Sequence, residues 1–373
     1  MIKNEKERLI WLGLAAAARL GQREINLLLR AVDGDLQEVL EQTEVLATRV
    51  GLAKGPRKRL SAINVLEAGQ WVSELSVRCG ATVLMNGDPA WPTCLDVLDN
   101  PPGALFTRGQ LTEEGVASVA LVGSRRCSHY GQRTARRLSE GLAEIGVIVV
   151  SGLARGIDRA AHEGTLDCKG VTWAVLGSGV DNVYPPESVR LADRIANERG
   201  CVLSEFSPDV GPRPHFFPRR NRIIAALADV TIVVEAASRS GALITARWAA
   251  DAGKDVGVVP GPVDSSQSEG ALALIRDGCT MVRGVDDICE LLGFSGDGRE
   301  GEMSARANAT CLSGPRTALE NRIVGALDHE PLSLDLVMIE AQGSAGEVLT
   351  ALMSLENRGV VLQGPPMMFR VAM

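Results

Sequence analysis

Residues 147–166, VIVVSGLARGIDRAAHEGTL, decide the fold class of this chain. An apolar run typical of a buried strand (147–150) leads through a loop with two glycines into a segment of helical periodicity (156–166). The same order of strand, short loop and helix returns several times. Strands that alternate with helices indicate a parallel sheet with helices on both faces, so we predict an α/β fold.

The other predicted elements of this region follow the same alternation. The further strands are 118–122, 172–176, 202–204, 231–234 and 255–259, and the further helices are 130–145, 188–199, 222–227 and 242–253. Sheets of this kind bind their ligands at the carboxyl ends of the strands. The loops that follow the strands are therefore the expected place of a site.

The residues outside the α/β region predict further domains. Residues 1–66 have apolar positions at helical spacing, interrupted by glycines, which predicts a small helical bundle. Residues 67–293 hold a proline-rich connector and the α/β core. Residues 294–315 are rich in Gly, Ser and charge without periodicity, as linkers are. Residues 316–373 form the last predicted domain.

This last domain has the order of elements of a winged helix. Its predicted helices are 316–327, 332–341 and 346–357, and its predicted strands are 360–363 and 367–371. The third helix has Glu347 and Glu356 against Arg358, which suits a phosphate-lined groove poorly. We therefore expect this domain to contact protein rather than read DNA.

The overall composition restricts the class of protein. The 373 residues have a net charge of -7, which excludes a basic, histone-like protein but not a local basic groove. Aromatic residues make up only 3%, which argues against binding of single strands mainly by base stacking. A nucleic-acid ligand would have to be held through its phosphates.

Cysteine usage and hydropathy indicate a cytoplasmic protein that does not enter a membrane. The eight cysteines include no Cys-x-x-Cys pair, so we expect no metal site, and we expect buried thiols in a reducing compartment. The run LIWLGLAAAA (9–18) superficially resembles a signal peptide, but Glu5 and Glu7 interrupt the positive region before it. No apolar run approaches the roughly 18 residues that span a bilayer.

Loops at the expected binding edge combine glycine, hydroxyl and arginine residues. Glycine lets a ligand approach the backbone, the next helix offers free amides, and arginine adds forked donors, so these loops suit an anion. Neither a Walker P-loop nor a Gly-x-Gly-x-x-Gly fingerprint is present. The predicted site residues are Gly123, Ser124, Arg125, Ser151, Gly152, Arg155, Gly156, Tyr184, Arg219, Arg220, Asn221, Arg222, Ser240 and Gly241.

Some roles in these loops stay open at this point. Tyr184 either stacks on a base or covers the edge of the sheet. Asp158 either belongs to the site or only begins a helix, where the dipole favours a carboxylate. A buried member of the arginine cluster at 219–222 would pair with Asp229 or Glu235.

No catalytic arrangement is evident in the sequence. The four histidines have no obvious nucleophilic partner, and there is no Ser-His-Asp set, metal-binding cluster or Walker pair. We therefore expect a binding protein without a cofactor, and not an enzyme.

The ordered motifs together resemble the DprA/Smf family of bacterial DNA-processing proteins. They are Gly123-Ser124-Arg125, Ser151-Gly152-Leu153-Ala154-Arg155-Gly156-Ile157-Asp158, Gly179-Val180-Asp181 with Tyr184-Pro185, Ser204-Glu205-Phe206, residues 217–225 and residues 235–246, within a likeness that runs from about Asp88 to Leu292. The resemblance implies an extended Rossmann-like core, with a SAM-like helical bundle and a winged helix as common additions. It also implies that Arg125 contacts phosphate.

The resemblance further implies function and partners. Proteins of this family bind single-stranded DNA without sequence preference, form homodimers, and load the RecA recombinase onto incoming strands during natural transformation. They displace or cooperate with single-strand-binding protein. We expect the dimer surface within residues 272–292.

Two other functions are kept as alternatives. A nucleotide-binding enzyme of the phosphoribohydrolase type would need a Pro-Gly-Gly-x-Gly-Thr loop, where this chain has Ser238-Arg239-Ser240-Gly241-Ala242. A transcription regulator would need a more basic terminal helix.

Overall fold

The computed structural model describes residues 4–111 and 115–294 and part of the C-terminal segment, namely 319, 322, 323, 327, 332–341, 343, 346, 348, 351, 352, 355, 361–364 and 368–371. The chain divides into two compact units, Met1–Ser295 and Gly296–Met373. The first unit holds the helical bundle and the α/β core.

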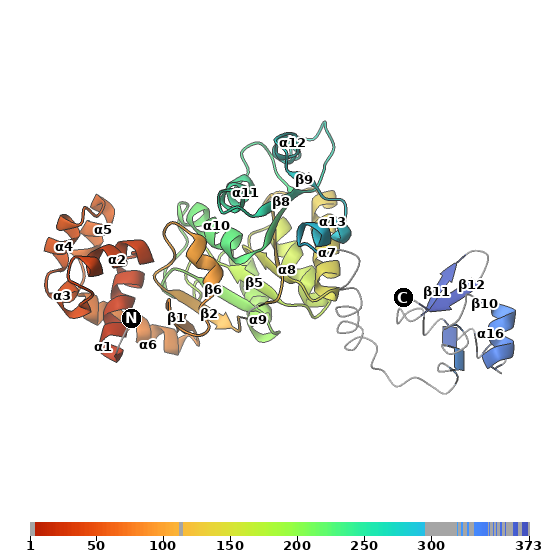
Figure 1. The fold of residues 1–373 in the computed structure, drawn as a ribbon, viewed down its shortest axis with the longest axis horizontal. Coiled ribbons are helices and arrows are strands. Elements are labelled where there is room, and N and C mark those ends of the chain that lie inside the picture. The colour runs from red at the N-terminus through yellow and green to blue at the C-terminus, as the bar shows by residue number, and fades with distance from the viewer. Residues whose placement is uncertain are drawn as a thin grey trace. The chain divides into compact units, whose positions relative to one another are not determined.

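The core is built on a nine-stranded sheet of order β1-β2-β6-β5-β4-β3-β7-β8-β9 (Figure 1). Seven neighbouring strands are parallel, which confirms the α/β prediction. They are β3 (Ser118–Gly123), β4 (Ile148–Ser151), β5 (Thr172–Val175), β6 (Cys201–Ser204), β7 (Val230–Glu235), β8 (Asp255–Val258) and β9 (Thr280–Met281).

Two strands of the connector extend this sheet and were not predicted. β1 (Thr82–Leu84) pairs antiparallel with β2 (Leu105–Gly109), and β2 pairs antiparallel with β6. The prolines at 89, 92, 101 and 102 lie between the two strands and not within them, so they remove no hydrogen bond from the sheet.

Helices cover both faces of the sheet because consecutive residues of its central strands, which point to opposite faces, are apolar. Val119 and Leu121 of β3 pack with α7, α8 and α13, whereas Ala120 and Val122 pack with α10 and α11. The helices of the core are α7 (His129–Glu144), α8 (Ile157–Asp167), α9 (Val189–Asn197), α10 (Phe216–Leu227), α11 (Ala242–Asp251), α12 (Glu269–Arg276) and α13 (Val285–Leu291).

Helix α10 begins earlier than the sequence predicted. It starts at Phe216 instead of Arg222, so the arginine cluster lies in its first two turns and not in a loop. Pro218 does not interrupt this helix, because a proline is tolerated in the first turn, where its missing N–H would have no partner. The helical periodicity therefore fixes which arginine faces which neighbour.

The N-terminal residues form the predicted helical bundle. Its helices are α1 (Glu5–Leu12), the π-helix η1 (Gly13–Ala17), α2 (Gln22–Arg30), α3 (Leu36–Glu41), α4 (Thr43–Arg49), α5 (Lys54–Leu60) and α6 (Val65–Arg78). The run LIWLGLAAAA is mostly buried inside this bundle. Residue 66, the predicted domain end, falls inside α6, where the bare backbone of Gly69 lets the helix approach the carbonyl of Leu9.

The bundle and the core are in direct contact. The indole N–H of Trp11 donates to the carbonyl of Gly103 at 2.6 Å, and Arg8 pairs with Asp88 at 3.0 Å. Buried residues of the bundle continue into the cluster around Phe106 of β2. The first unit is therefore packed as one body.

The C-terminal unit has the predicted elements where it is described, except that Leu332–Ser333, predicted as the start of a helix, form a strand paired with β12. Helix α16 (Leu334–Ala341) follows β10 (Leu332–Ser333), and β11 (Val361–Gly364) and β12 (Met368–Val371) form a sheet of order β10-β12-β11. The residues described within 316–327 and 346–357 are helical. Glu347, Glu356 and Arg358 lie outside the described residues.

Two general properties concern thiols and membranes. Every cysteine in the described part of the chain is a free thiol, but only Cys201 is buried, so the expectation of buried thiols was wrong for the half-buried others. Across the same residues, no helix is both long and apolar enough to cross a bilayer.

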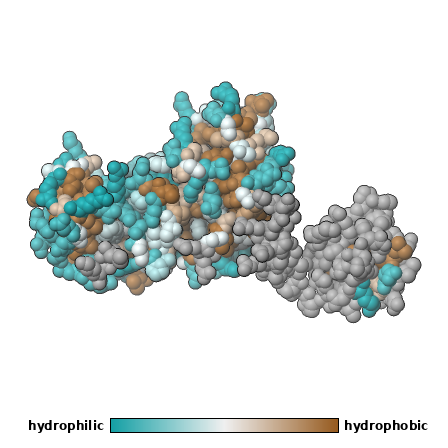
Figure 2. Space-filling model, in the orientation of Figure 1, coloured by the Kyte–Doolittle hydropathy of each residue, from teal (hydrophilic) through white to brown (hydrophobic). Residues whose placement is uncertain are grey.

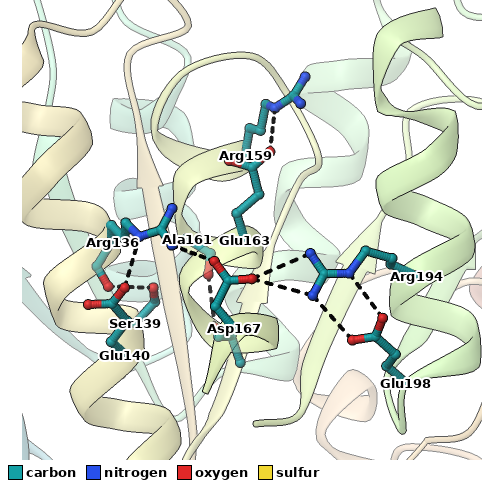
Figure 3. A network of polar contacts seen from close by, with 10 residues as sticks. Arg136, Ser139, Glu140, Arg159, Ala161, Glu163, Asp167, Arg194 and Glu198 are labelled. Carbon is teal, nitrogen blue, oxygen red and sulfur yellow. Dashed lines mark hydrogen bonds and ion pairs between the residues drawn. The ribbon is translucent and has the colours of Figure 1, made fainter. Parts of the chain in front are cut away.

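The outer face of α7, α8 and α9 has a network of ion pairs (Figure 3). Asp167 of α8 pairs with Arg136 of α7 and with Arg194 of α9, and those arginines also pair with Glu140 and Glu198. We call these five residues the paired face. Both of its arginines pair with two carboxylates.

Candidate nucleic-acid interface

A cavity of about 440 Å³ opens at the carboxyl ends of the central strands. It is enclosed by the loops after β3, β4, β7 and β8 and by the first turns of α10 and α11. We call it the loop cavity. Its lining residues are Val122, Gly123, Ser124, Arg125, Arg126, Ala154, Asp158, Arg220, Asn221, Ile224, Ala237, Arg239, Ser240, Gly241, Ala242, Thr245 and Gln267.

Half of the predicted site residues line this cavity. They are Gly123, Ser124, Arg125, Arg220, Asn221, Ser240 and Gly241. They come from three separate segments of the sequence, which the parallel strand order brings to one edge. The strand-end rule therefore located the cavity correctly.

Arg220 is the buried cation at the base of the cavity. It is 3% exposed, and its Nη1 donates to the carbonyl of Val175 at 2.6 Å. Burial lowers the pKa of Arg220 to about 10, while the nearby Asp158 opposes that shift. Burial also raises the pKa of Asp158. The Nε of Arg220 is buried without a hydrogen-bond partner, so one donor is left for a ligand.

Two motif glycines hold the protein's own parts together. A Cβ on Gly152 would lie 1.8 Å from Nη1 of Arg220, and one on Gly156, whose φ is 78°, would lie 2.3 Å from the carbonyl oxygen of Ser124. We expected these glycines to admit a ligand. Instead they let the loop after β4 approach Arg220 and the loop after β3.

The buried side chain of His162 holds the loop between β4 and α8 in place. Its Nε2 accepts from the N–H of Leu153 at 3.3 Å, and its Nδ1 lies 2.7 Å from Oγ1 of Thr172, which donates to the carbonyl of Val149. Burial, with help from Arg220, lowers the pKa of His162 to about 3. The ring is neutral, and it supports the left-handed turn at Leu153 (φ 54°).

An aromatic ring supports the exposed cation at the rim. The guanidinium of Arg125 lies over the ring of Phe217 at 4.8 Å, and the ring of Tyr184 lies 5.6 Å from the same phenylalanine. Tyr184 is 37% exposed and stands beside the cavity without lining it. Both roles left open for this ring are compatible with its position.

Polar contacts tie the loops of the cavity to one another. The hydroxyl of Ser124 donates to Oε1 of Gln267 at 3.2 Å, and the amide of Asn221 donates to the carbonyl of Gly241 at 3.1 Å. Helix α11 has Gly241 as its N-cap, and its first amides bond within the turn: the N–H of Ala242 donates to the hydroxyl of Ser240 at 3.3 Å, and the next two donate to the carbonyls of Ser240 and Gly241. The arginines of the lining, and not these amides, suit the cavity to an anionic group.

The other predicted residues lie outside the cavity. Ser151 is buried and donates to the carbonyl of Leu121, and the exposed Arg155 pairs with Glu187. Arg219 and Arg222 share Glu205, at 2.8 Å and 2.6 Å. The expectation that a buried arginine of this cluster pairs with Asp229 or Glu235 was therefore wrong, because those carboxylates accept hydrogen bonds from Ser118 and Ser128.

Several lining residues were not among the predicted site residues. Arg126 and Arg239 are exposed cations next to predicted positions, and Gln267 comes from the loop after β8. Among the described residues, neither of these arginines nor Arg125 forms an ion pair. The strand-end rule, applied to the last loop as well, would have found Gln267.

Comparison with known families agrees with this geometry. Residues 82–293 match the family described as DNA recombination-mediator protein A, and residues 308–365 match the DprA winged helix domain. Protein Smf of Escherichia coli (strain K12) is 39% identical over 280 residues, which cover 74% of this chain and 73% of that protein. Protein Smf of Synechocystis is 32% identical over 345 residues, or 85% of each chain.

Solved structures give the same relationship. The X-ray structure of DNA processing protein A from Streptococcus pneumoniae matches with a TM-score of 0.65 and 32% identity, over 77% of this chain and 98% of that one. A structure of DNA processing protein A from Helicobacter pylori, reported with its single-stranded DNA binding mode, matches with a TM-score of 0.51 and 29% identity. The match covers 57% of this chain and 95% of that one. The chain therefore belongs to the DNA recombination-mediator protein A family, the DprA/Smf family that its motifs resemble.

Proposed function

We propose that this protein binds single-stranded DNA at the loop cavity, mainly through phosphates and without sequence preference. The observation that supports this most is the charge of the lining: Arg125, Arg126, Arg220 and Arg239 face a single carboxylate, Asp158, which is buried. Phosphate contacts give affinity but read no bases. The single-stranded DNA binding mode described for the Helicobacter pylori protein supports the same ligand class.

The proposal also assigns roles to individual site residues. Arg125 contacts a phosphate at the rim, Arg220 offers its free Nε from below, and Ser240 and Gly241 present the start of α11. Tyr184 gives one ring on which a base can stack. Arg155, Arg219 and Arg222 lie outside the cavity, so their contribution to this contact is indirect.

We also propose a place for this binding in recombination. The bound strand is protected and handed to the RecA recombinase, with single-strand-binding protein as competitor or partner, as the family resemblance implies. The protein then acts as a binding protein and not as an enzyme. A phosphoribohydrolase activity would instead release free base from nucleoside monophosphates, which chromatography of an incubated sample detects.

The protein is further proposed to act as a homodimer through the edge of the sheet at β9. Both residues of β9 are exposed, and Met281 is 47% exposed at the end of the strand order. Figure 2 shows hydrophobic residues gathered on the visible face of the core, in the region where Figure 1 places α11, β8 and β9. An open strand edge next to apolar residues favours pairing with a second copy.

A fluorescence anisotropy titration tests the binding proposal. Arg125→Ala is expected to weaken binding of all single-stranded oligonucleotides alike, and to reduce the slope of log K against log salt by about 0.7, the value for one phosphate. Arg194→Ala removes the same charge from the paired face and is the control. Loss confined to some sequences, equal loss in both variants, or preference for duplex would contradict the proposal.

A further inference from the structure

A second arginine-lined cavity lies between the helical bundle and the core. Its volume is about 370 Å³, and we call it the bundle cavity. Helix α10 contributes to both cavities, with Arg220 and Asn221 in the first and Arg219 and Arg222 in the second. The lining residues are Arg19, Glu24, Pro56, Arg59, Leu98, Asp99, Asn100, Arg219, Arg222 and Trp248.

Two guanidinium groups of the bundle cavity have buried donors without partners. Nη1 of Arg222 has none, although its Nη2 is bound to Glu205, and Arg222 as a whole is only 8% exposed. Nε of Arg19 is likewise buried without a partner. A native structure rarely leaves charged donors unsatisfied, so these atoms point to a ligand that accepts hydrogen bonds.

Arg19 is held toward the cavity by its backbone and by its neighbours. Its φ is 55°, a left-handed conformation that a residue with a side chain seldom adopts. Its guanidinium lies 5.3 Å from the ring centre of Phe216. Nε of Arg59 donates to the carbonyl of Ala18 at 2.7 Å, which brings a second cation beside it. Burial and the nearby Arg213, Arg59 and Arg219 lower the pKa of Arg19.

The charges around the cavity match a ligand with one negative charge. Four arginines line the cavity. Their charges are opposed by three carboxylates, those of Glu24 and Asp99 in the lining and of Glu205, which pairs with Arg219 and Arg222, so one positive charge is in excess. Asp209, which acts on Arg19, offsets Arg213. A phosphodiester has one negative charge, whereas a terminal phosphate at neutral pH has nearly two.

The remaining wall fits the apolar part of a nucleotide. Trp248 of α11 and the buried Leu98 face the same cavity as the arginines. A cation next to an aromatic ring is the usual arrangement by which proteins hold one unit of a single strand.

We propose that the bundle cavity takes a second nucleotide unit of the bound single strand, with its phosphodiester on Arg19, Arg59 and Arg222 and its sugar or base against Trp248. This rests on the proposed function. The helical bundle thereby becomes part of the DNA-binding surface, and α10 separates two phosphate contacts along one strand.

Oligonucleotide length separates the two cavities in an experiment on the full chain. The variant Arg19→Gln with Arg59→Gln is compared with Lys58→Gln with Arg78→Gln, which removes the same charge from exposed positions of the bundle. Thymidine dinucleotides and oligothymidylates of about twenty residues are titrated at several salt concentrations. A dinucleotide held in the loop cavity does not reach around α10, because a helix with its side chains is about 10–12 Å across.

The expected result is weaker binding of the long strand alone. The Arg19/Arg59 variant should bind it about tenfold more weakly, with a salt slope lower by about 0.7, and should bind the short strand normally. Trp248→Leu should weaken binding of the long strand with an unchanged slope, because no charge is removed. Equal binding of the long strand by the Arg19/Arg59 and control variants, or equal loss with both lengths, overturns the second site. An Arg125→Ala variant that binds both lengths normally overturns the proposed function instead.

Discussion

Two surfaces of the core are rich in arginine, but only one of them has cations without partners. On the paired face, Arg136 and Arg194 meet carboxylates on their own and neighbouring helices. At the loop cavity, Arg125, Arg126 and Arg239 meet none among the described residues. The absence of a protein carboxylate, and not the number of arginines, distinguishes the proposed anion site from the paired face.

The largest effect is expected for the buried member of the loop cavity. Arg220→Met removes the donor to Val175 and the main cation beside the buried Asp158, leaving only the exposed Arg125, so the free energy of unfolding should fall by about 3 kcal/mol. Urea denaturation followed by circular dichroism measures it. Arg159→Met removes a half-exposed, paired arginine and should cost less than about 1 kcal/mol. A similar decrease of the unfolding free energy in both variants would contradict the expected difference between the buried and the exposed arginine.

Acid should destabilise the protein through His162, which supports the loop cavity. The pKa of His162 is about 3 in the folded protein and ordinarily 6.5, so the unfolded chain binds the extra proton as the pH falls. As the pH falls from 6.5 to about 3, the free energy of unfolding should decrease by about 1.4 kcal/mol for each pH unit.

The contribution of the imidazole is isolated by a variant. Asp158, whose pKa is raised by burial, acts with the opposite sign, because it takes up a proton more readily when folded. His162→Gln keeps Asp158 and removes the imidazole. The difference between the two proteins in unfolding free energy should therefore shrink as the pH falls from 6.5; a constant difference would exclude this role of His162.

A smaller effect is expected at an exposed cation of the loop cavity. Arg239→Gln should weaken single-strand binding about fivefold and lower the salt slope by about 0.7, with little change in stability. Anisotropy titrations at several salt concentrations measure both. A variant that binds as tightly as the unmodified protein would place Arg239 outside the contact.

The smallest effect is expected on the paired face. Arg194→Gln should leave single-strand affinity unchanged and alter the unfolding free energy by no more than about 0.5 kcal/mol, since exposed ion pairs contribute little. The same two assays measure this. Weakened binding would mean that the network in Figure 3 belongs to the contact surface.

The fold was largely predictable because apolar periodicity and strand ends are local in sequence. The parallel strands and the edge that bears the cavity follow from runs such as 147–150 and the loops after them. β1 and β2 were missed because they are short and their pairing partners lie far along the chain. The start of α10 was missed because a proline in a first turn looks like a break.

The roles of single side chains were less predictable because they depend on contacts between distant segments. Sequence spacing places Arg219 to Arg222 together, but only helical geometry sends Arg220 to Val175 and Arg222 to Glu205. The glycines at 152 and 156 suggested a ligand, and they instead face an arginine and a carbonyl of the protein. No local signal indicates such partners.

The fixing of Arg220 and Arg222 by Val175 and Glu205 has a kinetic consequence. Their rotamers are set during folding, so little side-chain freedom remains to be lost when a strand arrives. Association then depends on encounter, which positive potential accelerates and salt slows, and not on rearrangement of the protein. Under the proposed function, a surface so prepared captures a strand quickly and releases it by ion exchange, without refolding of any loop.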